Sequence, residues 1–185
     1  MKNYLRRDGL ILMFLLMPFI IIFLKWNDFP DSIPIHFDVS GKPDKYSDKA
    51  FGLFLLPLMN IGLYLLLLAI PAIDPKKYNF EKFKDKYLII RIGMHVFITF
   101  VFALIAAHSL GYQFDFSMLL LYGVLMLLVL LGNYLRTVRP NFFIGIRTPW
   151  TLANEYVWTR THRFTATLWV ITTLVMMICL HLLYT

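Results

Sequence analysis

Residues 132–163 read GNYLRTVRPNFFIGIRTPWTLANEYVWTRTHR and lie between two long apolar runs. The stretch holds five arginines, two prolines and two glycines, so it is far richer than a short connector between membrane helices. Its aromatic and basic residues are typical of a folded element at a membrane surface. We therefore predict an ordered segment here, with apolar helices on both sides.

The composition outside this segment predicts a membrane protein. The chain has 185 residues, of which 59% are hydrophobic and 16% charged, and its mean hydropathy is +0.66. Soluble domains average about 45–50% apolar and about 25% charged residues. Five runs are expected to be long and apolar enough to span the roughly 30 Å hydrocarbon core of a bilayer. They are residues 9–26, 51–73, 87–110, 117–135 and 164–184. The predicted fold class is an all-α, polytopic helical membrane protein.

The basic residues indicate the orientation. Most of them lie in the first seven residues, in residues 74–91 and in residues 136–163. By the positive-inside rule, this distribution predicts a cytoplasmic N-terminus and an outer C-terminus. The net charge of +7 is then a topology signal that also attracts membrane lipids, and we expect no direct contact with nucleic acid.

The connection at residues 27–49 is expected on the outer side as an ordered loop. Pro34 favours an extended chain at residues 33–37, and a turn cluster follows at residues 39–44. Ser47 or Asp48 is expected to cap the second span.

His36 and Asp38 would share one face of an extended strand, among five aspartates in all. Three interpretations stay open: a compact polar cap, a site for a peptide or other ligand, or a metal site. The spacing matches no metal-binding motif, so we predict no metal and no cofactor.

In the inner segment, Glu155, Trp158 and His162 are spaced to line one side of a helix. Glu155 is the only acid among the five arginines and is expected to form an ion pair. Thr151 is a candidate cap, from which a helix of about 34 residues would run unbroken through the last span, at 1.5 Å per residue. With Arg147, that helix start would also offer an anion site.

Polar residues within the spans permit another function. Asn60, Arg91, His95 and Asn133 would form the polar path of a small transporter or ion-coupled carrier. No Asp or Glu lies deep in any span, so a carboxylate proton relay has little support. No nucleophile–base motif or phosphate-binding loop occurs, and we predict no enzyme activity and no catalytic residue.

Two regions together resemble a known family. The GN pair at residues 132–133, RPNFFIGIRTPWTL at residues 139–152 and W-x-x-THR at residues 158–163 resemble the signature of the SdpI family of bacterial membrane proteins. The outer segment resembles the small N-terminal domain of many members. Its matching residues are Pro34, His36, Phe37, Gly41, Asp44, Lys49 and Pro57.

This resemblance implies a multi-pass protein of the bacterial cytoplasmic membrane that protects the cell from a secreted antimicrobial peptide toxin. It also implies that a soluble transcriptional repressor is sequestered at the membrane. Family members are often drawn with six spans, whereas five are expected here. We divide the chain into an N-terminal two-span region, residues 1–86, and an SdpI-like region, residues 87–185.

The candidate binding residues fall in two groups. The outer group is His36, Phe37, Asp38, Gly41, Asp44 and Lys49. The inner group is Asn133, Asn141, Gly145, Arg147, Thr148, Pro149, Trp150, Glu155, Trp158, His162 and Arg163. We expect the first group to meet the toxin and the second to recruit a partner.

Overall fold

The computed structural model describes residues 7–38 and 40–184. The basic residues among the first six, and residue 39 of the predicted turn, lie outside this part of the chain. The described residues form two compact units, and each is treated by itself. The hairpin unit covers the chain up to residue 65 and residues 94–124, and the signature unit covers residues 66–93 and 125–185.

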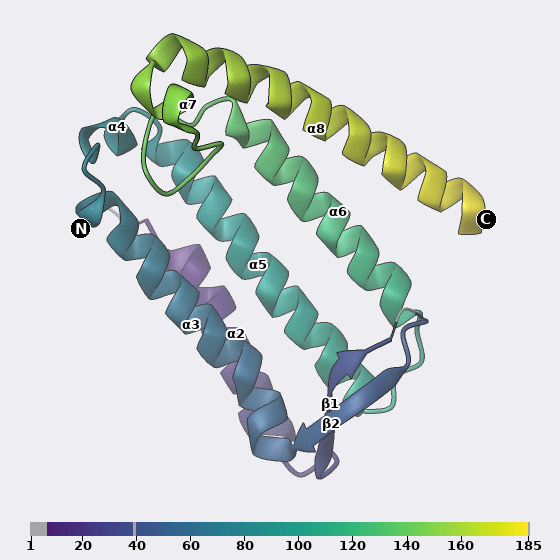
Figure 1. Cartoon of the computed structure of the whole chain (residues 1–185). Helices are drawn as coiled ribbons and strands as arrows, with labels where there is room; N and C mark the ends of the chain where they lie inside the picture. Colours follow the sequence, from purple (N-terminus) through teal and green to yellow (C-terminus); the bar gives the residue numbers. More distant parts are fainter. Residues whose placement is uncertain (1–6, 39, 185) are drawn as a thin grey trace. The chain divides into compact units, whose positions relative to one another are not determined.

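Apolar helices make up most of the chain (Figure 1). They are α2 (Gly9–Lys25), α3 (Lys49–Ile73), α5 (Lys84–Ser109), α6 (Phe116–Leu135) and α8 (Glu155–Tyr184). Among the described residues, α3, α5, α6 and α8 are each long and apolar enough to cross a membrane. Helix α2 is apolar but shorter, with 17 residues, or about 25 Å at 1.5 Å per residue. The predicted polytopic helical fold is confirmed. The division at residue 86 stays a prediction.

The outer segment adds a β-hairpin to the expected all-α fold. Strand β1 (Ser32–Phe37) pairs antiparallel with β2 (Pro43–Asp48), as Figure 1 shows. The extended stretch before the turn was predicted, whereas its partner strand, rich in charged residues, was not. Asp48 caps α3 as expected, because its carboxylate accepts a hydrogen bond of 3.0 Å from the Phe51 amide.

The hairpin lies against a small apolar core within its own unit. Ile22, Phe29, Ile33, Leu53 and Phe102 are all buried there. Close approach depends on a glycine of α3, because a Cβ at Gly52 would lie 2.6 Å from the Cβ of Ile33. Such a distance is sterically forbidden, so only glycine lets the strand lie directly on the helix.

Substitution of Gly52 by alanine should therefore loosen the hairpin. We expect a loss of about 1–3 kcal/mol, the usual cost of overpacking. Protease sensitivity of residues 32–48 and thermal unfolding in detergent would measure it. Gly62→Ala is the matched control in the same helix, since a Cβ there meets nothing within 4 Å. Equal unfolding temperatures for Gly52→Ala and Gly62→Ala would show that the close contact at Gly52 does not hold the hairpin on α3.

In the signature unit, the short helix α4 (Tyr78–Glu81) leads into α5 through a buried aromatic cluster. Phe80, Phe83 and Tyr87 are almost wholly buried. The Tyr87 hydroxyl donates a hydrogen bond of 2.5 Å to the carbonyl of Leu67 in α3. This cluster fixes the connection between α3 and α5 beside the signature segment.

The predicted unbroken helix after Thr151 was wrong. A separate helix, α7 (Pro149–Ala153), follows the N-cap residue Thr148, and Thr148 and Thr151 form a reciprocal capping box. The chain then turns extended at Asn154, whose side-chain oxygen accepts a hydrogen bond of 2.8 Å from the Tyr156 amide and so caps α8. In a continuous helix, the amides of Thr151 and Tyr156 would bond to backbone carbonyls of the preceding turn. Here they bond to the side chains of Thr148 and Asn154, so the chain forms two separately capped helices.

Candidate functional site

The signature loop, residues 139–153, is organised around one buried amide side chain. Asn141 donates hydrogen bonds to the carbonyls of Arg139 (2.8 Å) and Ile144 (3.0 Å). Its side-chain oxygen accepts from the amides of Phe143 (2.9 Å) and Ile144 (2.7 Å). Asparagine carries both a donor and an acceptor at this position, so it holds both sides of the turn. Asn141 therefore has a structural role.

Trp158 and His162 hold the same loop against α8. Both are buried, and their rings stack with centroids 4.1 Å apart. His162 Nε2 accepts from the Ile146 amide at 3.0 Å, and its Nδ1 lies 2.8 Å from the Trp158 carbonyl. These partners fix the neutral tautomer with the proton on Nδ1. The Trp158 indole donates to the carbonyl of Val138 at 2.8 Å.

A third attachment comes from the α3–α5 connection. Asp74 is buried, and its carboxylate accepts hydrogen bonds from the amides of Lys76 (2.6 Å) and Phe142 (2.8 Å). Asn79, also buried, donates to the Pro140 carbonyl at 2.7 Å. Sequence reasoning missed Asp74 and Asn79. The sequence did contain a signal for Asp74, because a carboxylate directly after an apolar span costs free energy unless hydrogen-bond donors satisfy it.

Gly145 is the position where the loop passes closest to α8. Its φ of +112° is a conformation that residues with a Cβ rarely adopt. A Cβ here would also lie 2.4 Å from His162 Nε2. The sequence motif therefore requires glycine for two independent reasons.

We expect Gly145→Ala to disorder the signature loop, because it combines backbone strain with a clash. Gly111→Ala is the matched control: φ there is +88°, but a Cβ meets nothing within 4 Å, so it should cost only about 1–2 kcal/mol of left-handed strain. Tryptophan fluorescence of Trp158 and limited proteolysis would compare them. The clash explanation fails if both variants lose the same stability.

The remaining inner candidates are exposed. Trp150 has 65% of its surface exposed and projects from α7, whose first residue is Pro149. Arg147 donates a hydrogen bond to the carbonyl of Phe142. Arg163 and Asn133 also lie at the surface.

Glu155 is also exposed, and its carboxylate lies 3.8 Å from the guanidinium of Arg139. The predicted ion pair is thus present, and it joins the start of α8 to the signature loop. Trp158 and His162 share the same side of α8 but are buried. The three residues therefore do not form one open binding face.

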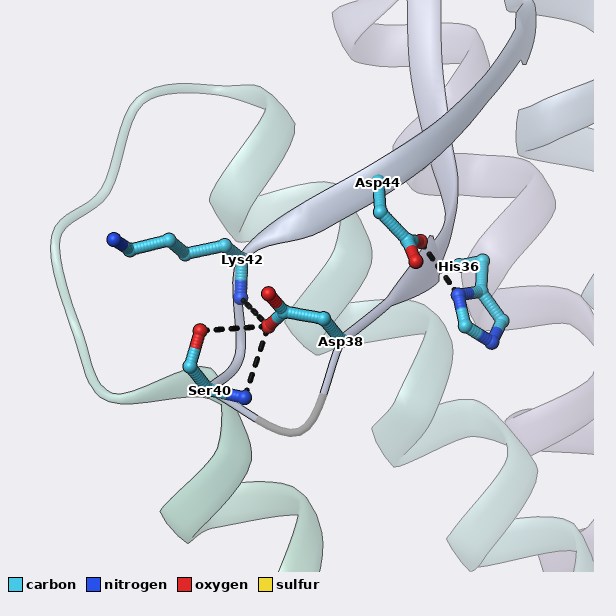
Figure 2. A network of polar contacts seen from close by, with 5 residues as sticks. All are labelled: His36, Asp38, Ser40, Lys42 and Asp44. Carbon is cyan, nitrogen blue, oxygen red and sulfur yellow. Dashed lines mark hydrogen bonds and ion pairs between the residues drawn. The ribbon is translucent and has the colours of Figure 1, made fainter.

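Figure 2 shows two polar clusters on the hairpin. His36 Nδ1 lies 2.5 Å from the carboxylate of Asp44 on the neighbouring strand. The carboxylate of Asp38 accepts hydrogen bonds from the Ser40 amide (2.9 Å), the Ser40 hydroxyl (2.7 Å) and the Lys42 amide (2.9 Å). His36 and Asp38 thus have separate partners. Among the described residues, no three His, Cys, Asp or Glu side chains gather closely enough to hold a metal ion.

The other outer candidates anchor the hairpin. Phe37 stacks on Phe116 at a centroid distance of 3.6 Å. Gly41 adopts φ of +78°, and a Cβ there would lie 2.7 Å from the hydroxyl of Ser117. Lys49 donates to the carbonyl of Trp26 at 3.2 Å. These contacts fix both ends of the hairpin.

An apolar groove of about 300 Å³ lies between these anchors. Strand β1 borders it, together with parts of α3, α5 and α6 from the hairpin unit. His36 and Phe37 contribute to its lining, as do Ile35, Leu55, Ile105 and Leu120. The groove thus combines an apolar interior with the exposed His36–Asp44 pair beside it.

The hydrogen bonds from Ser40 and Lys42 lower the pKa of Asp38 below its usual value of 3.8. The group is fully exposed, so the effect is local. Because the pKa of Asp38 is lower in the folded protein than in the unfolded chain, its ionised carboxylate stabilises the turn fully above about pH 4. This stabilisation is lost as the pH falls through the pKa of the folded protein.

The protection factors of the Ser40 and Lys42 amides, which compare their exchange rates with the intrinsic rate at the same pH, should therefore stay high near neutral pH and fall only as the pH drops through the lowered pKa of Asp38. Asp38→Asn should accelerate this exchange even at neutral pH, because the neutral amide accepts more weakly than a carboxylate. Asp44→Asn is the matched control, since it removes the same charge from the hairpin but no acceptor from this turn. Exchange rates that do not differ between the two variants would refute the role of Asp38.

A line of buried polar residues runs through the hairpin unit. Asp8, at the start of α2, accepts a hydrogen bond of 3.1 Å from the Tyr64 hydroxyl. His95 Nδ1 lies 2.7 Å from the side-chain oxygen of Asn60, and the Tyr64 and His95 rings are 5.9 Å apart. Asn60 also donates to Thr99 at 3.4 Å. The sequence pointed to Asn60 and His95, but it missed the carboxylate of Asp8.

Two families match this chain. Residues 13–61 match a domain of unknown function (DUF1648), and residues 137–185 match the SdpI/YfhL protein family. The predicted resemblance is confirmed. Residues 137–185 are thus similar to the SdpI/YfhL protein family. The hairpin lies within the first match, and the whole signature loop and all of α8 lie within the second.

A curated relative agrees with these matches. The chain is 28% identical over 137 residues to "Immunity protein SdpI" of Bacillus subtilis (strain 168). That alignment covers 73% of this chain and 62% of the relative. No solved structure matches the chain. The protein is therefore a multi-pass membrane protein with an SdpI-family signature, and the binding roles of its candidate residues remain predictions.

Proposed function

We propose that this protein protects a bacterial cell from a secreted antimicrobial peptide toxin. The observation that carries the proposal is its similarity to an immunity protein over 73% of the chain, together with the two family matches. The relative is longer than the matched region, so the activity is assigned here as a hypothesis. Nothing in the mechanism that follows requires a catalytic residue.

The hairpin is the proposed contact for the toxin. It stands on the outer side if the N-terminus is cytoplasmic, as the basic residues indicate. The apolar groove beside β1 would take apolar side chains of the peptide. The exposed pair of His36 and Asp44 would offer polar contacts next to it. A rigid, anchored hairpin lowers the entropy cost of such binding.

The signature loop is the proposed contact for a cytoplasmic partner such as a soluble repressor. If every helix crosses once, the loop faces the side opposite the hairpin. Trp150 supports this role because it is 65% exposed and its ring is not needed to hold the loop together. Tryptophan and arginine are enriched among the residues that dominate binding energies at interfaces.

The test is growth of a toxin-sensitive bacterium that expresses the protein, challenged with candidate peptide toxins. We expect expression to raise the tolerated toxin concentration, and His36→Ala and Trp150→Ala to reduce it. Both side chains are exposed, so their removal should change stability by no more than about 0.5 kcal/mol. Protein level in the membrane fraction must be measured for each variant.

Two controls match the variants. Asp28→Ala removes another exposed charged partner from the outer segment, and Tyr156→Ala removes an aromatic ring that is 70% exposed. Both should retain protection. The proposed roles are contradicted if His36→Ala and Trp150→Ala protect fully, or if the controls lose protection to the same degree.

The buried polar line supports a second function, an ion-coupled carrier. Polar groups within a membrane protein are costly and often mark an ion pathway. Asp8, Tyr64, His95 and Asn60 form such a line in the hairpin unit. Arg91 and Asn133 of the predicted path belong to the signature unit instead. Proton flux in proteoliposomes that His95→Gln abolishes would favour the carrier, whereas absence of flux with intact protection would exclude it.

A further inference from the structure

The GN pair of the signature is not explained by the loop contacts, and it lies beside a groove between α6 and α8. This α6/α8 groove has a volume of about 180 Å³. It is lined by Asn133, Arg136, Ala166, Thr167, Val170 and Ile171. All six residues belong to the signature unit.

Gly132 brings the two helices together next to the groove. A Cβ at this position would lie 3.2 Å from Trp169 Cγ and 3.2 Å from Val170 Cγ2, both on α8. Such contacts are tighter than real Cβ atoms usually show, so a larger residue would push α8 away from α6. The glycine of the GN pair thus sets the width of the groove.

The polar groups of the groove come mainly from Asn133 in the last turn of α6 and from Arg136, the residue that follows this helix. Arg136 and Asn133 are one helical turn apart, and the guanidinium donates a hydrogen bond of 3.5 Å to the Asn133 oxygen. Both side chains are exposed. A guanidinium has five donors in a planar fork that matches the oxygens of a phosphate. Arg136 therefore keeps donors for an anion while Asn133 orients it.

The α8 side of the groove is mostly apolar. Ala166, Val170 and Ile171 line it, and the hydroxyl of Thr167 is already bonded to the carbonyl of Arg163 at 3.1 Å. The volume of the α6/α8 groove, about 180 Å³, is below the roughly 300–1,000 Å³ of typical ligand pockets. The space therefore suits a segment of one flexible chain rather than a compact molecule.

We propose that the α6/α8 groove binds an anionic phospholipid, with the phosphate on Arg136 and part of one acyl chain along α8. A cationic end next to an apolar strip complements such a lipid in both charge and polarity. The surrounding stretch, residues 132–163, has five arginines and one glutamate, so its charge also attracts anionic lipid. Basic pockets between membrane helices are known to bind anionic headgroups.

The experiment uses the full-length protein, purified in detergent and mixed with equal amounts of phosphatidylglycerol and phosphatidylethanolamine. Lipid retained after gel filtration is quantified by mass spectrometry. We expect phosphatidylglycerol to be retained about fivefold over phosphatidylethanolamine, the factor expected from one arginine near a charged headgroup. Arg136→Gln should bring that ratio close to one.

Three further arms make the result specific. Lys84→Gln removes one positive charge from another helix of the same unit and should keep the preference. Thr167→Phe, at an exposed position, should fill the groove and lower retention of both lipids. Glycerol phosphate, the headgroup without chains, should not displace bound lipid at equal concentration.

The proposal is overturned if Arg136→Gln keeps the preference, or if Lys84→Gln loses as much of it. Displacement by glycerol phosphate would show a simple anion site and would also overturn it. Circular dichroism and gel filtration of each variant separate lost lipid binding from lost folding. The lipid-binding experiment does not depend on toxin protection, so its failure would leave the proposed function untouched, and the reverse also holds.

Discussion

Backbone amides and carbonyls that lie beside a hydrocarbon layer must find partners inside the protein, and this requirement shapes the irregular parts of the chain. Within a helix, the backbone amides and carbonyls meet this requirement by bonding to one another. The signature loop meets it with side chains: Asn141 serves the turn that follows Arg139, His162 accepts the Ile146 amide, and Asp74 accepts the Phe142 amide. Each of these three side chains is buried. An ordered, non-helical segment at the end of a membrane helix is stable only because they are there.

The hairpin meets the same requirement by pairing its strands and by capping. Its register brings Ser32 opposite Asp48 and Phe37 opposite Pro43. Asp38 satisfies the amides of the turn, and Asp48 satisfies the start of α3. Glycines then allow close contact with helices, Gly52 at the strand and Gly41 at the turn. The result is a hairpin anchored at both ends beside an apolar groove, as the proposed binding of an apolar peptide requires.

Structural and exposed residues of the signature can now be separated. Asn141, Gly145, Trp158 and His162 hold the loop in place and are poor candidates for direct partner contact. Trp150, Arg147 and Arg163 are exposed, Asn133 lines the α6/α8 groove, and Gly132 packs against α8 beside it. A motif that is continuous in sequence therefore serves at least two physical purposes. Its internal contacts shape the loop, and its exposed side chains are left to meet lipid or protein.

The sequence by itself determined the membrane helices, because length and hydrophobicity are local properties that decide whether a segment crosses a bilayer. It also located the extended stretch before the hairpin turn, narrowed the cap of α3 to Ser47 or Asp48, and identified both regions of family resemblance. Only the tertiary structure decided which polar groups pair. Asp8 with Tyr64 and Asp74 with Phe142 are separated by 56 and 68 residues. The second strand and the break at Asn154 were likewise decided by partners distant in the chain or by competing caps. Such pairings depend on how helices meet in space, and periodicity along one segment carries no information about that.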